Sequence, residues 1–245
     1  MFTSTNFISH LLEVRTRLLY SFVALLVIFL GFLPWAADLY TLLAHPLLAK
    51  LPNGGQMIAI GVITPFFVPI KVALMAAFLV ALPYIMYQAW SFIAPGLHAH
   101  EKRMTLPLVM ASTTLFYCGM SFAYFAVFPI MFGFIVGSAP QGVAVMTDIS
   151  EYLSFVLSMF MAFGIAFQVP VVVVVLVKMN LVTIAKLRES RPYVIVGAFV
   201  AGAIFTPPDV ISQFMLAIPM WLLYEAGIVV AVWMTKSKPP DVKPQ

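Results

Sequence analysis

The chain has 245 residues, of which 63% are hydrophobic and 9% are charged; its formal net charge is +4 and its mean hydropathy is +1.05. An ordinary soluble domain carries about 25% charged residues and cannot bury so many apolar side chains, so the composition excludes a soluble protein and indicates lipid as the solvent. The single cysteine, Cys118, excludes an internal disulfide, and basic residues spread over short loops exclude a nucleic-acid-binding face.

The amino end predicts a short amphipathic helix over residues 1–17 that lies on the membrane surface. Glu13 and Arg17 are four residues apart on this helix and are expected to pair. The first apolar span follows at residues 18–33. No A-x-A cleavage site comes after it, so we expect a retained anchor rather than a cleaved signal peptide.

Residues 34–67 are expected to form a long outer loop, in which 38–51 contributes one or two short helices. The second span is predicted at 68–87. Lys71 lies near its outer end, and its long side chain can carry the amine to the membrane interface. The third span is predicted at 106–129.

A second outer loop, without Lys or Arg, is expected at residues 130–151. The fourth span is predicted at 152–177, and a basic connector at 178–191 follows it. Lys178, at the inner end of this span, is expected to be an interfacial anchor.

The last two spans differ in length. Residues 192–205 would cover about 21 Å as a helix, well short of the ~30 Å hydrocarbon core, so this helix must be screened from lipid or the bilayer must thin beside it. The sixth span is predicted at 210–234. The polar tail at 235–245 is predicted to be disordered.

Lys and Arg residues are distributed unequally between the two sides. Of the 13 Lys and Arg residues, all except Lys50 and Lys71 lie at the amino end, in the 88–105 and 178–191 connectors, or in the tail. The positive-inside rule then puts both termini in the cytoplasm. We therefore predict one all-α polytopic domain over residues 1–234, with six transmembrane helices.

The connector at 87–103 carries aromatic residues, a Pro95-Gly96 helix break and the carboxylate of Glu101 close together, which is typical of a binding surface. Glu13 is expected on the same side of the membrane. In one interpretation both carboxylates are solvated charges that pair with basic neighbours. In the other they attract a cationic ligand, for which the planar guanidinium of arginine is the best match.

Catalytic motifs are missing from the sequence. It contains no H-E-x-x-H, C-x-x-C, G-x-S-x-G or phosphate-loop pattern. The four histidines are expected in loops or in the surface helix: His10, His45, His98 and His100. We therefore expect no enzyme, no metal site and no cofactor.

Two polar residues are predicted inside the membrane, Gln168 in the fourth span and Glu225 in the sixth. A carboxyl group in hydrocarbon is costly, so Glu225 should face the bundle interior, be protonated or have a partner. Gln168 either donates an interhelical hydrogen bond or has a further role. Asp209, in a proline-rich turn, is expected to cap the helix after it.

Several stretches in order resemble the TatC family, the receptor subunit of the twin-arginine protein translocase. They are Tyr87-Gln-Ala-Trp-Ser-Phe-Ile-Ala-Pro-Gly-Leu-x-x-x-Glu101-Lys-Arg, Phe116-Tyr-Cys-Gly-Met-Ser-Phe-Ala-Tyr-Phe, and Arg191-Pro-Tyr-x-x-x-Gly-Ala-Phe through Thr206-Pro-Pro-Asp-x-x-Ser-Gln. The resemblance implies a cupped six-helix bundle with short fifth and sixth helices in the bacterial inner membrane. It also implies recognition of signal peptides on folded cargo, TatB and TatA as single-span partners, self-association, and use of the proton-motive force.

The resemblance assigns roles to particular residues. Those it places at the signal peptide are Glu101, Glu13, Phe92 and Leu97, with Arg15 and Arg17 in support. Those it ties to translocation or partner docking are Pro46, Tyr124, Thr206, Asp209 and Gln213. Many family members have a glutamate where this chain has Gln168, so a role that needs a charge there does not carry over.

Three other classes compete with a receptor. A proton-coupled transporter of small solutes would use Glu225, but the first three spans offer few polar groups to line its path. A structural scaffold would not need Glu13 and Glu101. An intramembrane protease would need a nucleophile with a base, which the sequence does not supply.

Overall fold

The computed structural model describes residues 4–48, 57–93, 105–137, 146–205 and 210–236. Apart from an isolated bridge between Ile58 and Asp148, the regular structure in these ranges is helical. The elements are α1 (Ser4–Phe32), the 3₁₀ turn η1 (Leu33–Trp35), α2 (Ala36–Leu48), α3 (Thr64–Ile93), α4 (Thr105–Phe122), the π-turn η5 (Ala123–Val127), α5 (Phe128–Gly137), α6 (Ile149–Ala166), α7 (Val169–Lys178), α8 (Ile184–Glu189), α9 (Arg191–Phe205) and α10 (Val210–Lys236).

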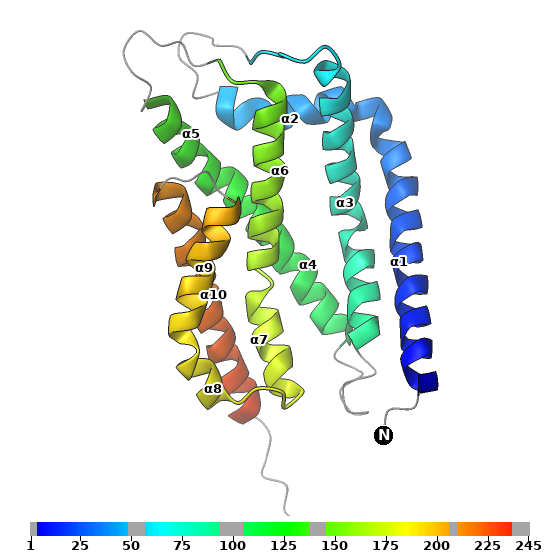
Figure 1. The fold of residues 1–245 in the computed structure, drawn as a ribbon, viewed down its shortest axis with the longest axis vertical. Helices are drawn as coiled ribbons and strands as arrows, with labels where there is room; N and C mark the ends of the chain where they lie inside the picture. Colours follow the sequence, from blue (N-terminus) through cyan, green and yellow to red (C-terminus); the bar gives the residue numbers. More distant parts are fainter. Residues whose placement is uncertain (1–3, 49–56, 94–104, 138–145, 206–209, 237–245) are drawn as a thin grey trace, which may run out of the picture.

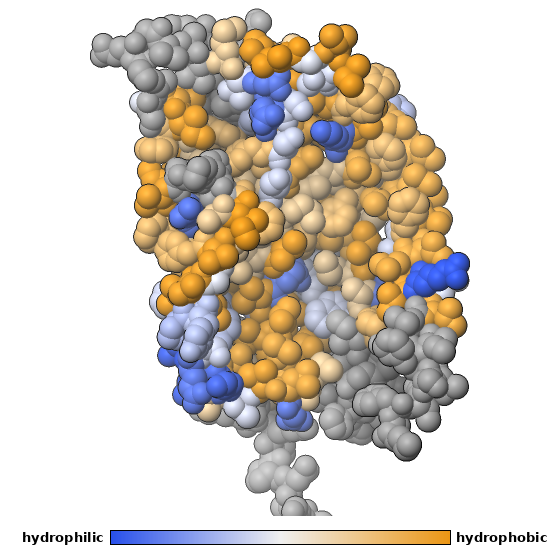
Figure 2. Space-filling view, viewed as in Figure 1, coloured by the Kyte–Doolittle hydropathy of each residue, from blue (hydrophilic) through white to orange (hydrophobic). Residues whose placement is uncertain are grey.

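Five stretches are long and apolar enough to cross a membrane: Leu12–His45, Thr64–Phe92, Leu106–Gly137, Ile149–Lys178 and Gln213–Met234. The shorter apolar helix α9 is the sixth. Apolar side chains cover most of the face shown in Figure 2, as expected where lipid is the solvent. The six predicted passes are thus present. α9 is short, as expected, at 15 residues, whereas α10 has 27 and is not short.

Figure 1 shows how the helices are arranged. α1 packs on α3, which also contacts α4 and α6, while α7 packs on α10 and α10 on α9. α4 and α5 cross obliquely behind the steeper helices, and α2 lies across one end of the bundle. We call that end the outer end. The end at which α1 begins and α10 finishes is the inner end, so the described chain begins and finishes at the same end of the bundle.

Two predicted boundaries are wrong. The surface helix and the first span form one continuous helix, α1, because neither Pro nor Gly interrupts residues 4–30 and the chain turns only at Pro34. The third span continues helically through the predicted loop at 130–137. Pro129 would clash with the carbonyl four residues earlier in a regular α-helix, and the wider π-turn that ends at Val127 accommodates it.

The main core lies where the continuous stretch of α4, η5 and α5 crosses α6. Phe116, Phe128 and Phe163 are almost completely buried there. Gly119 faces the other helix so closely that an added Cβ would lie 2.5 Å from the carbonyl oxygen of Phe163. A Cβ on Gly164 would overlap the ring of Phe116. Glycine is therefore required on both helices for this close approach.

Candidate functional site

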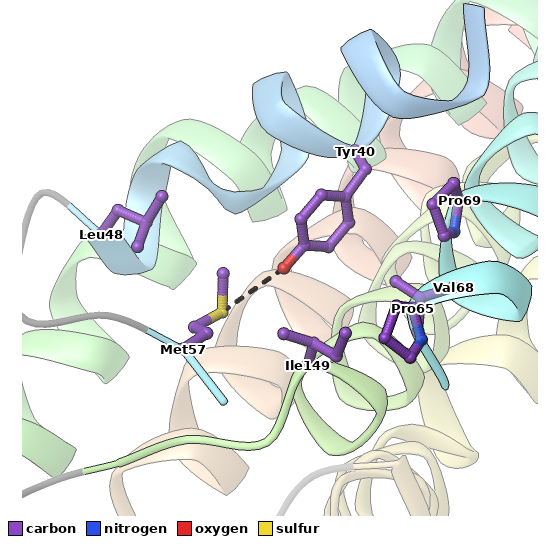
Figure 3. Close-up of a pocket in the computed structure, with 7 residues that line it drawn as sticks. All are labelled: Tyr40, Leu48, Met57, Pro65, Val68, Pro69 and Ile149. Atoms are coloured by element: carbon purple, nitrogen blue, oxygen red, sulfur yellow. Dashed lines mark hydrogen bonds between the residues drawn. The ribbon is translucent and has the colours of Figure 1, made fainter. Parts of the chain in front are cut away.

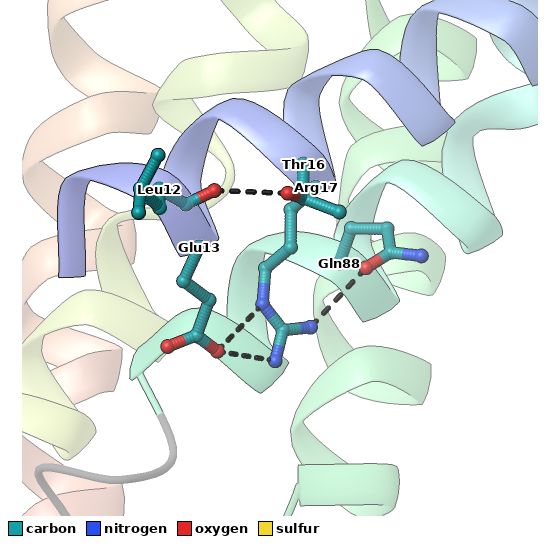
Figure 4. A network of polar contacts seen from close by, with 5 residues as sticks. All are labelled: Leu12, Glu13, Thr16, Arg17 and Gln88. Carbon is teal, nitrogen blue, oxygen red and sulfur yellow. Dashed lines mark hydrogen bonds and ion pairs between the residues drawn. The ribbon is translucent and has the colours of Figure 1, made fainter. Parts of the chain in front are cut away.

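A charged network lies at the inner end of α1 (Figure 4). Arg17 donates from Nη2 and Nε to the same carboxylate oxygen of Glu13, Oε1, at 2.7 and 3.0 Å. Its Nη1 donates to the side-chain oxygen of Gln88 at 3.2 Å, which ties α1 to α3. The other oxygen of Glu13, Oε2, has no partner among the described residues, and the side chain is 36% exposed. The predicted Glu13–Arg17 pair is confirmed, and the contacts within the described residues use only one of the two carboxylate oxygens.

Of the other four residues assigned to the signal peptide, the structure describes two. Arg15 is exposed on α1, and Phe92 is partly buried in the last turn of α3. Leu97 and Glu101 lie outside the described residues. α3 ends at Ile93, so the chain leaves the helix close to Gln88.

Gln168 lies at the short break between α6 and α7. The break has a local cause, because Pro170 supplies no amide hydrogen and its ring disfavours a regular turn before it. The Gln168 side chain donates from Nε2 to the backbone oxygen of Ser112 at 2.9 Å. Trp90 donates from its indole nitrogen to the hydroxyl of Ser112 at 2.8 Å, and Ser112 is completely buried.

These contacts join α3, α4 and the α6–α7 break through neutral groups. They confirm the hydrogen-bonding interpretation of Gln168. Sequence reasoning missed Trp90 and Ser112, because single Trp and Ser residues in apolar spans carry no spacing signal that pairs them.

Glu225 has an ion-pair partner, which was one of the three alternatives expected for it, although the sequence did not indicate which residue the partner would be. Its Oε2 accepts from Arg191 Nη2 at 2.6 Å, across the contact between α10 and the start of α9. The carboxylate side chain is 24% exposed and the arginine 45%. Glu225 is therefore held as one half of an ion pair near the inner end.

The outer end carries a second group of polar contacts, in which tyrosines hold α2. Tyr124, in the π-turn, donates from its hydroxyl to the backbone oxygen of Leu42 at 3.0 Å. Pro46 lies four residues after Leu42 in α2 and has no amide hydrogen, so Leu42 lacks its normal helical donor. Tyr124 supplies that donor. The bond therefore ties the π-turn to α2 at the carbonyl that the Pro46 backbone leaves without a donor.

Tyr152 makes a matching contact that the sequence did not reveal. Its hydroxyl donates to the backbone oxygen of Leu43 at 2.8 Å, and the residue is 3% exposed. Beside it, Tyr40 reaches the sulfur of Met57 at 3.8 Å. Tyr40 and Met57 help to line a largely apolar cavity of about 430 Å³ between α2, α3 and α6 (Figure 3).

Asp148 fixes the start of α6. Its carboxylate accepts backbone hydrogen bonds from Ser150 at 2.8 Å, Glu151 at 3.2 Å and Ile60 at 2.9 Å. The bond from Ile60 is the main cause that lowers the pKa of Asp148 below its usual value, because hydrogen bonds to the carboxylate favour the charged form. The adjacent bridge adds backbone bonds from Ile58 to Thr147 and from Ile149 to Ile58.

Gln213 is partly buried in the first turns of α10. It lies against Gly202 of α9, where an added Cβ would be 3.4 Å from the Cα of Gln213. Thr206 and Asp209 lie outside the described residues, so the capping role of Asp209 stays a prediction.

In the described ranges no three His, Cys, Asp or Glu side chains gather as a metal site.

Comparisons with known proteins agree on one family. Residues 9–219 match the family model "Sec-independent protein translocase protein (TatC)". The chain is 55% identical to the protein of that name from Azotobacter chroococcum mcd 1, over 90% of this chain and 87% of the relative. It is 52% identical to the protein of the same name from Escherichia coli strain K12, over 90% of this chain and 86% of the relative. A crystal structure titled "Twin Arginine Translocase Receptor- TatC" superposes with a TM-score of 0.81 at 41% identity, over 92% of this chain and 99% of that one.

Proposed function

Because the chain belongs to the TatC family, we propose that it is the signal-peptide receptor and core subunit of a twin-arginine translocase, which exports folded proteins across the bacterial inner membrane. It is a multi-pass helical membrane protein. Both termini face the cytoplasm in this proposal, since the described basic residues Lys186, Arg188 and Arg191 lie at the inner end, where α1 begins and α10 finishes.

One observation carries the receptor role. The network of Glu13, Arg17 and Gln88 sits at the inner end, and it leaves Oε2 of Glu13 open within the described part of the chain. A guanidinium from a signal peptide can donate to that oxygen while Arg17 keeps Oε1. Glu101 supplies a second carboxylate in the proposal, so that each arginine of the pair has its own acceptor.

Further parts of the proposal concern partners and energy. TatB and TatA pack around Thr206 and Gln213, Asp209 contributes to translocation or partner docking, and copies of the chain associate within the complex. The proton-motive force drives transport. Glu225 gives no support to the alternative of a proton-coupled small-solute transporter, because an arginine already holds its carboxylate.

Co-purification tests the receptor role. The full chain is expected to retain a peptide with two arginines and to release the same peptide with two lysines. Glu13→Gln and Glu101→Gln should each reduce retention. Glu189→Gln is the matched control, because it removes a carboxylate in the inner connector that pairs only with Lys186 among the residues described. Equal retention of both peptides by the parent chain would overturn the proposal.

A further inference from the structure

A pocket of about 260 Å³ opens between α8, α9 and α10 near the inner end, away from the Glu13 network. Its lining combines charged and apolar side chains: Arg188, Arg191, Glu225, Ile228, Val229 and Val232. The four residues from α10 recur at helical spacing and so form one face of that helix. Basic groups from the connector thus meet an apolar helix face.

The basic side of this pocket is held in place by its neighbours. Arg191 is fixed by its 2.6 Å bond to Glu225. Leu187, next to Arg188, is 6% exposed, and its backbone oxygen accepts from the Tyr224 hydroxyl at 2.8 Å and from the Ser190 amide at 3.1 Å. α8 is therefore anchored on α10, and the backbone that carries Arg188 is fixed.

The charges in the pocket do not balance. Two guanidinium groups face a single carboxylate, and Arg188 has no ion-pair partner within the described ranges. Lys186, on the same short helix, does not line the pocket and pairs with Glu189 at 3.4 Å. The excess positive charge at this point favours an anionic ligand.

The apolar side indicates that the ligand also has a hydrocarbon part. Val229 is 65% exposed and lies in the membrane span Gln213–Met234, so its side chain faces lipid. Basic pockets between membrane helices at the cytoplasmic surface bind lipid head groups, and arginine binds phosphate through two parallel hydrogen bonds.

We propose that this pocket binds an anionic phospholipid of the inner leaflet. Arg188 donates to the phosphate, Arg191 adds its charge, and an acyl chain lies along Val229 and Val232. The proposal requires that the chain lies in a bilayer with its inner end facing the cytoplasm, as proposed above, and it is independent of signal-peptide recognition.

A lipid titration tests this site. The delipidated full chain in neutral detergent is titrated with phosphatidylglycerol, with phosphatidylcholine of the same acyl chains, and with glycerol phosphate, and thermal unfolding is followed. The parent should be stabilised most by phosphatidylglycerol. Arg188→Gln should weaken its apparent affinity about tenfold. Lys186→Gln, which removes an equal charge outside the pocket, should leave the affinity unchanged.

The three ligands also separate the sources of binding. If glycerol phosphate binds as tightly as phosphatidylglycerol, or if phosphatidylcholine stabilises as much, the lipid site does not exist. Equal binding by Arg188→Gln and the parent would overturn it too. Arg188→Lys keeps the charge but loses the planar fork, so an intermediate loss is expected from a variant that retains its fold.

Discussion

The two ends of the bundle are held by different kinds of contact. At the outer end, Tyr124, Tyr152 and Asp148 bond to backbone groups and fix α2 and the start of α6. At the inner end one such bond, from Tyr224 to Leu187, anchors α8, but ion pairs between partly exposed side chains are added there, as in Glu13–Arg17 and Arg191–Glu225. Contacts to the backbone fix the geometry of helices. Partly exposed charges remain available to ligands, so recognition is expected at the inner end and shape is set at the outer end.

Breaking the Arg191–Glu225 pair should have the largest effect on stability. Arg191→Gln leaves a carboxylate that is only 24% exposed without its partner, and we expect a loss of about 2 kcal/mol in the free energy of unfolding. The double variant Arg191→Gln, Glu225→Gln should recover at least half of that loss. Denaturant unfolding in detergent measures both. A double variant as unstable as the single one would show that the pair is not the cause.

Removing the Tyr124 hydroxyl should have a smaller effect at the outer end. Tyr124→Phe leaves the Leu42 oxygen without a donor, at a cost of about 1 kcal/mol. Pro46→Ala restores an amide hydrogen four residues after Leu42, so it should suppress the Tyr124→Phe loss. A double-mutant cycle with thermal unfolding tests this coupling, and simple additivity would contradict it.

Asp148 makes the outer end sensitive to acid. Its pKa is lowered on folding, so its contribution to stability is present above its unfolded pKa of about 4 and is lost as the pH falls through the folded value. Hydrogen exchange of the Ile60 and Ser150 amides should therefore speed up below about pH 4 beyond the intrinsic rate. Asp148→Asn should show faster exchange already at neutral pH and lose this extra acid dependence.

The exposed pair Lys186–Glu189 should contribute least. Both side chains are 69% exposed, and such pairs contribute about 0–1 kcal/mol. Lys186→Gln should change the free energy of unfolding by less than about 0.5 kcal/mol in the same denaturant experiment. If Lys186→Gln lowered the free energy of unfolding as much as Arg191→Gln, solvent exposure would not explain how much each of these two ion pairs contributes to stability.

The sequence predicted the six passes and the Glu13–Arg17 pair, because hydropathy and i,i+4 spacing are local signals. It did not predict that α1 is continuous, because amphipathic spacing alone does not show where a helix turns. The π-turn before Pro129 and the break before Pro170 were also missed. A proline indicates strain but not how the chain relieves it.

Long-range contacts limited the prediction of the site. Tyr152 and Leu43 are 109 residues apart, and Gln168 and Ser112 are 56 apart, so nothing in their spacing pairs them. Arg191 was interpreted only as a connector charge that sets orientation. Its bond to Glu225 required the packing of α9 on α10.

The most direct test measures how much more tightly a twin-arginine signal peptide binds than the same peptide with two lysines. The ratio of the two affinities is compared between the parent and the double variant Glu13→Gln, Glu101→Gln. We expect the parent to bind the arginine peptide at least about tenfold more tightly, because bidentate guanidinium–carboxylate bonds have no lysine equivalent. The double variant should bind both peptides equally. A ratio that is unchanged in the double variant would contradict recognition by carboxylates at the inner end.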